Sequence, residues 1–394
     1  MPRVLRIINR FNLGGPTYNA AYLSAYLDGD YESLLIGGMK DESEDSSEFI
    51  VEELGLEARI IDKMRRPIRP HKDLEAYRQL KELIGDYKPD VVHTHASKPG
   101  ALGRYAAHKL GVPVIVHTFH GHVFHSYFNP ALTAFYKRLE RSLARISTAI
   151  VAISDKQKEE LVYQHHICPA EKVEVIPLGF DLQRFQLDIA GKRTRFRKRY
   201  GLKEGDVAIC IVGRLVPIKN HKLFFEAVKW AKARSKKAFK VFVVGDGELR
   251  AELEAYCKSL GLIYSGGTED PADIHFTSWI KEVDEVNAGC DIMVLSSLNE
   301  GTPVSLIEAQ AANLPIVSTE VGGISDVVIK GETALLSPVG DVEAFGHNLL
   351  KLIDDDELRA KMGEKGWLHV KDKFHYRRLV EDIRGLYDRL LMRI

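Results

Sequence analysis

The sequence predicts an α/β protein built from two doubly wound parallel domains. Short apolar runs alternate with amphipathic segments along almost the whole chain, a pattern typical of parallel strands joined by crossover helices. The alternation halts once, where PLGFDLQRF leads into the basic segment GKRTRFRKRYGLKEGD. Because 394 residues exceed what one hydrophobic core usually holds, we expect two domains joined by a linker near 177–190.

The predicted strands follow one another in a regular order. In the first half they are VLRII, YESLLI, ARII, DVVHTH, PVIVHT, TAIVAIS and KVEVIP, and in the second VAICIVG, KVFVVG, DIHFTSW, CDIMVLS, PIVST and TALLS. The chain closes with DKFHYRRLVEDIRGLYDRLLMRI, a long amphipathic helix with no strand after it. Its apolar stripe comprises Phe374, Leu379, Ile383, Leu386, Tyr387 and Leu390, whose spacing predicts burial of one helix face.

Composition excludes several classes of protein. The formal net charge is +0, so the chain has no overall attraction to nucleic acid. No apolar run reaches the length of about 18 residues that a membrane-spanning helix needs, and PRVLRIIN leads straight into a strand, so we expect no signal peptide. Cys168, Cys210, Cys257 and Cys290 are scattered, which indicates buried thiols in a reducing cytosol rather than disulfides or a zinc site.

Residues 297–318, SLNEGTPVSLIEAQAANLPIVS, predict a helix with an anion-binding N-terminus. Thr302 is a good N-cap and Pro303 suits the first helical position. The N–H groups of Val304 and Ser305 would then be free to bind an anion, which the helix dipole also favours.

Two glutamates, Glu300 and Glu308, flank the start of this predicted helix. A carboxylate beside an anion site is explained if it binds another part of the same ligand, such as sugar hydroxyls. A nucleotide sugar has both parts, a diphosphate for the amides and hydroxyls for the carboxylates. The alternative is a capped helix with two solvated glutamates.

Two cations follow the first predicted strand of the second domain, in IVGRLVPIKNHKLFFEAV. Arg214 leaves the end of this strand, and Lys219 lies near the start of a helix expected to begin around Asn220. Such a pair can neutralise a diphosphate leaving group without a metal. No D-x-D sequence follows a predicted strand, so we expect no metal site. Two ordinary surface cations are the alternative.

Glycines follow two of the predicted strands. Gly14 and Gly15, in NRFNLGGPTYNAAYL, would let the backbone approach a ligand closely, although a tight packing turn is an equal alternative. VVGDGELR has Arg250 in place of the third glycine of a dinucleotide fingerprint, which disfavours a dehydrogenase.

Histidines gather at the ends of two predicted strands of the first domain. The group comprises His93, His95, His117, His120, His122 and His125. The spacing lacks the acidic or cysteine partners that zinc would need. We favour His120 as a ligand-binding residue, because Gly121 opens space beside its imidazole for a sugar hydroxyl or carbonyl.

Taken together, these segments resemble the family-4 glycosyltransferases of the GT-B fold, the E-x7-E group 1 enzymes. The segments that carry the resemblance are GGPT, HTFHG, AISD, VIPLGFDLQRF, GRLVPIKN, VGDGELR and EGTPVSLIEAQAANLPIVSTEVGG. They span nearly the full chain and keep the order of the family.

The resemblance implies an architecture of two Rossmann-like domains that face each other across a cleft. Residues 1–180 would bind the acceptor and residues 190–371 the nucleotide sugar. Residues 372–394 would form a helix that crosses back and packs on the first domain.

The resemblance also implies transfer with retention at the anomeric carbon. From the absence of a D-x-D sequence after a predicted strand we expect this transfer to be metal-independent, and we expect no cofactor beyond the donor. Residues expected in catalysis are His120, Arg214, Lys219 and Glu300. Residues expected to bind the donor are Gly14, Gly15, Trp279, Ile280, Gly301, Thr302, Pro303, Val304, Ser305 and Glu308. In this assignment Arg214 and Lys219 hold the diphosphate, Glu308 binds the ribose, and His120 touches the sugar. Trp279 and Ile280 frame the base.

We expect the donor to be a UDP-linked hexose or N-acetylhexosamine and the acceptor to be a glycan or a lipid-linked sugar of a surface polysaccharide. Two alternatives remain open, namely a sugar-nucleotide epimerase on the same fold and a noncatalytic nucleotide-sugar-binding protein. The Arg214 and Lys219 element disfavours the epimerase, and the presence of Lys219 and Glu300 disfavours the binding protein.

A helix expected over 128–147 suggests contact with an anionic membrane. Its basic side carries Lys137, Arg138, Arg141 and Arg145, and its apolar side carries Leu132, Phe135, Tyr136, Leu139 and Leu143. The basic segment RRPIRPHK (65–72) belongs to the same domain. We therefore expect a cytoplasmic protein held peripherally on the inner face of the membrane, with an ordinary helix covering a sheet as the alternative.

Overall fold

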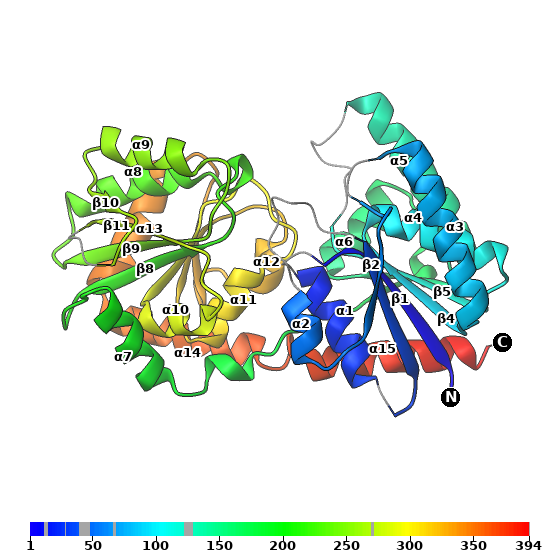
Figure 1. The fold of residues 1–394 in the computed structure, drawn as a ribbon. Helices are drawn as coiled ribbons and strands as arrows, with labels where there is room; N and C mark the ends of the chain where they lie inside the picture. The colour runs from blue at the N-terminus through cyan, green and yellow to red at the C-terminus, as the bar shows by residue number, and fades with distance from the viewer. Residues whose placement is uncertain are drawn as a thin grey trace. The chain divides into compact units, whose positions relative to one another are not determined.

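The computed structural model describes residues 1–11, 15–27, 29–38, 48–65, 68–121, 129–268 and 272–393. The chain forms two compact units, Met1–Phe180 with Phe374–Ile394 and Asp181–Lys373. Each unit is a parallel β-sheet with helices on both faces (Figure 1). The predicted α/β class with two doubly wound sheets is therefore confirmed.

The first unit contains, in its described residues, a seven-stranded sheet in the order β3-β2-β1-β4-β5-β6-β7. Its strands are β1 (Arg3–Arg10), β2 (Glu32–Gly38), β3 (Ala58–Ile61), β4 (Val91–His95), β5 (Val114–Phe119), β6 (Ala149–Ala152) and β7 (Val173–Val175). Its helices are α1 (Gly15–Tyr26), α2 (Glu48–Glu53), α3 (Pro70–Tyr87), α4 (Ser97–Lys109), α5 (Pro130–Ile146), α6 (Asp155–Glu159) and α15 (Tyr376–Leu391). The strand order changes direction between β1 and β4. The carboxyl ends of these strands are thus the switch point at which such sheets bind ligands.

The second unit contains, within the part described, a seven-stranded sheet in the order β10-β11-β9-β8-β12-β13-β14. Its strands are β8 (Val207–Val212), β9 (Phe239–Val244), β10 (Tyr264–Ser265), β11 (Ile274–Ser278), β12 (Ile292–Leu295), β13 (Ile316–Thr319) and β14 (Ala334–Ser337). Its helices are α7 (Ile189–Arg199), α8 (His221–Lys232), α9 (Arg250–Ser259), α10 (Val283–Gly289), α11 (Val304–Ala311), α12 (Ile324–Val327), α13 (Val342–Asp354) and α14 (Asp356–Val370). Here the switch point lies between β8 and β12.

Alternate residues of the first sheet pack against opposite helix layers, as the two-residue period of a strand requires. Val4 packs in the cluster that contains the apolar residues of α15, whereas Leu5 packs with α3 and α4. All six residues of the predicted C-terminal stripe are buried, from Tyr387 at 0% to Leu390 at 7% exposed. Helix α15 is therefore part of the first unit, although the whole second unit precedes it in the sequence.

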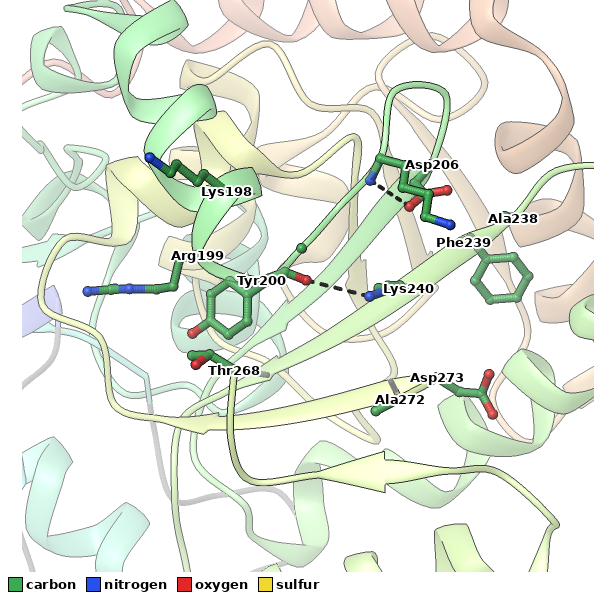
Figure 2. Close-up of a pocket in the computed structure, with 12 residues that line it drawn as sticks. Lys198, Arg199, Tyr200, Asp206, Ala238, Phe239, Lys240, Thr268, Ala272 and Asp273 are labelled. Carbon is green, nitrogen blue, oxygen red and sulfur yellow. Dashed lines mark hydrogen bonds between the residues drawn. The ribbon is translucent and has the colours of Figure 1, made fainter. Parts of the chain in front are cut away.

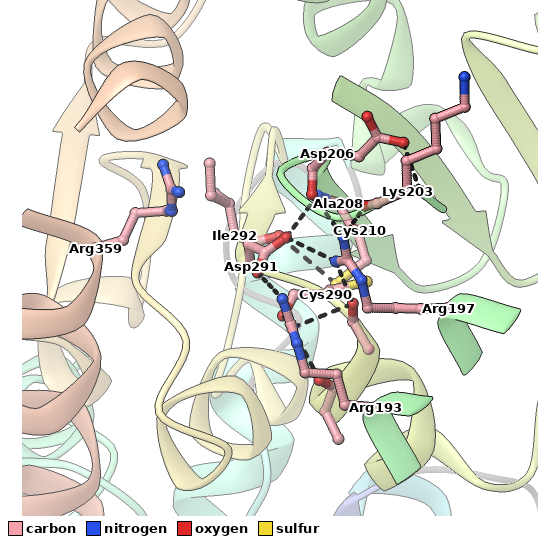
Figure 3. A network of polar contacts seen from close by, with 12 residues as sticks. Arg193, Arg197, Lys203, Asp206, Ala208, Cys210, Cys290, Asp291, Ile292 and Arg359 are labelled. Atoms are coloured by element: carbon pink, nitrogen blue, oxygen red, sulfur yellow. Dashed lines mark hydrogen bonds and ion pairs between the residues drawn. The ribbon is translucent and has the colours of Figure 1, made fainter. Parts of the chain in front are cut away.

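The basic segment after the linker forms α7. Two arginines of this helix form ion pairs with the rest of the second unit (Figure 3). Arg193 Nη2 and Arg197 Nη1 lie 2.7 and 3.3 Å from the two carboxylate oxygens of Asp291. The N–H of Ala208 donates to the same carboxylate at 2.7 Å. Arg193 also donates to the carbonyls of Gly289 and Cys290 at the end of α10. These cations therefore dock a helix and are not an open nucleic-acid surface.

Candidate active site

In the second unit the predicted cations lie at the carboxyl end of β8. Arg214 is exposed on the loop after the strand, and Lys219 ends the 3-10 turn Pro217–Lys219. Lys219 Nζ lies 2.5 Å from Glu300 Oε1, which also accepts a hydrogen bond from Ser297 Oγ at 2.6 Å. Because β8 and β12 are neighbours, this ion pair stands at the switch point.

The loop that carries Glu300 is held by close backbone contact with a glycine turn. Gly323 N–H donates to the Glu300 carbonyl at 3.0 Å. A Cβ at Gly322 would lie 2.0 Å from the Glu300 carbonyl oxygen, and one at Gly323 would lie 1.8 Å from that of Gly301. Only glycine permits this approach, so the turn positions the Glu300 main chain.

Helix α11 follows this loop and begins at Val304, with Pro303 as its N-cap. The prediction that Thr302 is the N-cap is wrong, because Pro303 has an extended ψ of 97° and helical geometry starts only after it. The first-turn N–H groups of Val304 and Ser305 have no carbonyl four residues earlier within the helix. The N-terminus of α11 is therefore still suited to an anion.

Glu308 lies one turn inside α11 and is half-buried. Burial raises the pKa of its carboxyl from 4.5 to about 7, an effect that Arg184 opposes and Asp284 reinforces. A ligand that donates hydrogen bonds to the ionised carboxylate would offset this cost of burial.

Trp279 and Ile280 follow β11 at the same edge of the sheet. Trp279 is 37% exposed, and Ile280 is half-buried. Ser278 precedes them with a positive φ of 56° and accepts a hydrogen bond from Gly245 N–H at 3.0 Å. This contact joins the ends of β9 and β11, which leaves the indole on the carboxyl edge of the sheet.

In the first unit the predicted residues lie at the ends of β1 and β5. Gly15 opens α1 and is buried, while Gly14 lies outside the described residues. His120 directly follows β5 and is half-buried. A Cβ at Gly121, which has a φ of 134°, would meet no atom within 4 Å. The space expected beside His120 is therefore present in the described part of the unit.

The other histidines divide into two groups. His122 and His125 lie outside the described residues. His93, His95 and His117 are at most 1% exposed, and burial lowers the pKa of each. His117 Nδ1 is 2.8 Å from Thr94 Oγ1, which is a structural contact inside the sheet.

Three contacts at the carboxyl ends of the strands were not predicted. They are Ser297 with Glu300, the glycine turn with Glu300, and His95 Nδ1 at 2.9 Å from His120 Nε2. Each contact involves residues at or after the end of a strand. For the His95–His120 contact, the only signal in the sequence was the His-x-His pattern at 93–95.

A pocket of about 790 Å³ lies at the opposite edge of the second sheet, near the amino ends of β8 and β9 (Figure 2). Its lining residues include Lys198, Tyr200, Lys203 and Lys240, and none of the predicted site residues. Lys240 Nζ lies 3.5 Å from the Tyr200 carbonyl.

Among the described residues, no group of three or more His, Cys, Asp or Glu side chains is arranged to hold a metal ion. No helix among them has both the length and the apolar composition needed to cross a bilayer.

Two doubly wound sheets, with predicted site residues at the carboxyl edge of each, define the GT-B class of fold. The chain belongs to the family-4 glycosyltransferases: residues 14–184 match the family model Glycosyltransferase Family 4, and residues 192–368 match Glycosyl transferases group 1. The UDP-Gal:alpha-D-GlcNAc-diphosphoundecaprenol alpha-1,3-galactosyltransferase of Escherichia coli is 32% identical over 317 residues, which are 80% of this chain and 79% of that protein. The putative glycosyltransferase EpsD of Bacillus subtilis is 26% identical over 82% of each chain.

Solved structures agree on the fold. Anabaena Alr3699/HepE in complex with UDP has a TM-score of 0.80 at 17% identity and covers 98% of this chain and 99% of its own. WaaG, a glycosyltransferase involved in lipopolysaccharide biosynthesis, has a TM-score of 0.70 at 18% identity over 96% and 98% of the two chains.

Proposed function

We propose that the protein is a retaining glycosyltransferase that moves a hexose or N-acetylhexosamine from a UDP-sugar to a lipid-linked glycan acceptor in surface polysaccharide synthesis. The observation that carries this proposal is the Lys219–Glu300 ion pair at the switch point, beside the N-terminus of α11. The Escherichia coli relative, whose name gives a UDP-sugar donor and a diphosphoundecaprenol-linked acceptor, supports the choice of substrates.

The donor would be bound by the second unit through complementary groups. Arg214, Lys219 and the first amides of α11 would bind the diphosphate, and Glu308 would accept hydrogen bonds from the ribose hydroxyls. Trp279 with Ile280 would frame the base. Gly14 and Gly15 would lie against the diphosphate and acceptor.

In the glycosyl-transfer step, the bond from the anomeric carbon of the sugar to the β-phosphate oxygen breaks. The acceptor oxygen forms the new bond on the same face of the sugar, and its proton goes to the leaving phosphate oxygen. Negative charge develops on that phosphate, where Lys219 and Arg214 stabilise it without a metal. Glu300, the residues Gly301–Val304 and His120 would hold the sugar in place.

The test is a transfer assay on the full chain in EDTA, with UDP-galactose or UDP-N-acetylglucosamine and a synthetic α-D-GlcNAc-diphosphate lipid. We expect UDP and a glycosylated lipid with an α-configured new bond, formed only when both substrates are present. An isomerised UDP-sugar formed without acceptor would indicate an epimerase. UDP binding without turnover of any tested pair would indicate a binding protein, and activity lost in EDTA and restored by manganese would overturn metal independence.

The raised pKa of Glu308 predicts a pH-dependent affinity for the donor. In the folded chain this pKa is about 7 and in the unfolded chain about 4.5. The contribution of Glu308 to the stability of the folded chain therefore decreases as pH rises from 4.5 through 7. The ionised carboxylate is the better acceptor for ribose hydroxyls. If only the ionised form binds, UDP-galactose affinity should rise about tenfold between pH 6 and pH 8.

Calorimetric titration of UDP-galactose checks this, because its diphosphate does not titrate in that range. The Glu308→Gln variant should show a flat profile across the same pH range. An equally steep profile in that variant would assign the effect to another group.

We further propose that the first unit attaches to an anionic membrane through the N-terminal ends of α3 and α5. Crossover helices run opposite to the strands, so these ends lie at the carboxyl edge of the sheet. That edge carries four exposed apolar side chains, Ile68, Leu74, Leu132 and Phe135. Arg69 and His71 are exposed beside them, Arg138 is exposed in the middle of α5, and Arg145 is exposed in its last turn, at the other end of the helix.

The structure changes which basic residues are available to the membrane. Arg141 donates to the carbonyls of His165 and His166 at 2.9 and 3.0 Å, so it caps a neighbouring turn. Arg138 and Arg145 remain exposed on α5. Each basic residue near an anionic surface is worth about 1 kcal/mol.

Co-sedimentation with phosphatidylglycerol vesicles checks the attachment. Binding should fall with salt, with Arg69→Glu/Arg138→Glu, and with Phe135→Ser. The matched control is Lys198→Glu/Lys203→Glu, which makes the same charge change in the second unit and should leave binding unchanged. No sedimentation of the parental chain at low salt would contradict membrane attachment while leaving glycosyl transfer intact.

A further inference from the structure

The segment VVGDGELR contains one residue to which the proposed function gives no role, namely Arg250. Arg250 is the first residue of α9, so its cation lies in the first turn of that helix. Cations are unfavourable at a helix N-terminus, because the helix dipole favours anions there. The guanidinium is therefore badly placed for the stability of α9, and most of its hydrogen bonds go to residues outside the helix.

The guanidinium of Arg250 joins the ends of two neighbouring strands, β9 and β11. Its Nη1 donates to Asp246 Oδ2 at 2.9 Å and to Ser278 Oγ. Ser278 Oγ in turn donates to the same Asp246 Oδ2 at 3.1 Å. Within α9, the Nε–H of Arg250 donates to Glu254 Oε1 at 2.9 Å. Asp246 lies just after β9 and Ser278 ends β11, so these two side chains and Arg250 form a closed triangle at the carboxyl edge of the sheet.

This triangle holds a backbone conformation that serine rarely adopts. Ser278 has a φ of 56°, in the left-handed region, which a residue other than glycine keeps only where its surroundings hold it. The Ser278 carbonyl accepts a hydrogen bond from the N–H of Gly245 at 3.0 Å, and its hydroxyl is bound by Arg250 and Asp246. Trp279 follows directly in the chain, so the position of its main chain depends on Ser278.

Asp246 is also anchored to the loop that carries Arg214. The N–H of Leu215 donates to the Asp246 carbonyl at 2.9 Å. A Cβ at Gly247 would lie 2.5 Å from the Leu215 carbonyl oxygen, so this close backbone contact needs glycine. These contacts are made by the main chain, and a substitution at Arg250 should leave them in place. The loop of Arg214 and the end of β11 are therefore joined through Asp246.

We propose that Arg250 is a positioning residue for the donor nucleotide, which fixes the base-framing segment Trp279–Ile280 relative to the loop that carries Arg214. This inference rests on the proposed function for the identity of the ligand. A nucleoside diphosphate binds both segments at once, so its affinity depends on their separation being fixed in advance. Inorganic pyrophosphate binds only the diphosphate groups and does not depend on that separation. Arg250 thus favours a complete nucleoside diphosphate over pyrophosphate.

Hydrogen exchange of the full chain without ligand tests the triangle itself. In Arg250→Gln the backbone amides of residues 277–280 should exchange roughly tenfold faster than in the parental chain, because Ser278 loses its charged donor. Glu254→Gln is the matched control, since it removes the ion pair within α9 and leaves the bonds of Arg250 to Asp246 and Ser278. Its exchange should equal that of the parental chain. Parental exchange at residues 277–280 in Arg250→Gln would overturn the inference.

Calorimetric titration with UDP and with inorganic pyrophosphate gives the second readout. Arg250→Gln should weaken UDP binding about tenfold and leave pyrophosphate binding unchanged. Ser278→Ala removes the shared hydroxyl and should weaken UDP binding by a similar factor. Because both substitutions break the same triangle, the double variant should bind UDP no more weakly than either single variant.

Three results of the titration would overturn the inference. They are parental UDP affinity in Arg250→Gln, additive losses in the double variant, and equal losses for UDP and pyrophosphate, which would assign Arg250 a general structural role. A parental chain that does not bind UDP would count against the proposed function, whereas the exchange experiment still decides whether Arg250 holds Ser278.

Discussion

The Lys219→Ala variant is expected to lose about 10²–10³-fold in kcat, with a smaller change in affinity for the acceptor. The ammonium lies at the carboxyl end of β8 and is held 2.5 Å from Glu300. In the proposed reaction it neutralises charge that develops on the leaving phosphate. Removing one such preorganised group typically costs about 10²–10³ in rate. Arg214→Ala should act in the same direction.

The Lys219–Glu300 ion pair gives this experiment a specific expectation. A bound diphosphate would compete with Glu300 for Lys219 and release the carboxylate to the sugar hydroxyls. In steady-state kinetics, Lys219→Ala should therefore lower kcat strongly and change KM for the donor much less. Unchanged thermal unfolding would exclude loss of fold as the cause.

Lys222→Ala is the matched control. Lys222 lies in the first turn of α8 and pairs with Glu252 at 2.5 Å, but both side chains are about half exposed, at 46% and 55%. An exposed pair of this kind is worth about 0–1 kcal/mol, and it is remote from Glu300 in the sequence. Its loss should leave kcat unchanged. Near-parental turnover in both Lys219→Ala and Arg214→Ala would mean that the site is misplaced.

The strand pattern was predictable because parallel strands buried on both faces are nearly continuous apolar runs. Thirteen such runs were expected, and each lies in or overlaps a strand of the structure. The strand β10 was missed, since it has only the two residues Tyr264–Ser265 and is held by pairing with β11. Sheet order could not be derived from spacing, because it depends on which crossover each helix makes.

The candidate site was predictable at the level of residues but not of contacts. Lys219 and Glu300 each follow a strand, and this placed both at the carboxyl edge. Their pairing depends on β8 and β12 being neighbours, which no local pattern encodes. The glycine turn at 322–323 was expected only as part of a family motif, and its role became clear from the 2.0 Å approach to the Glu300 carbonyl.

A chain that ends at Lys373 is expected to lose the fold of its first unit. It lacks α15, whose Leu379, Ile383 and Leu386 are at most 4% exposed against the first sheet. It also lacks the bonds of Arg378 Nη2 to the carbonyls of Pro177 and Leu178, at 2.7 and 2.8 Å. Cutting one large buried side chain to alanine costs about 2–5 kcal/mol, and a whole domain is stable by only about 5–15 kcal/mol. Loss of several such side chains together exceeds that margin.

Differential scanning calorimetry and limited proteolysis check this expectation. The second unit is continuous in sequence, from Asp181 to Lys373, so its transition should survive while that of the first unit disappears. The milder Leu386→Ala should cost about 2–5 kcal/mol in the first unit alone, whereas Met392→Ala, at a side chain 85% exposed, should stay within about 0.5 kcal/mol. A truncated chain with both transitions unchanged would mean that α15 only covers a sheet face that is stable without it. The contacts of Tyr387 with Arg6 and His93 argue against that outcome, because truncation would remove one hydrogen-bond partner from each of these two buried side chains.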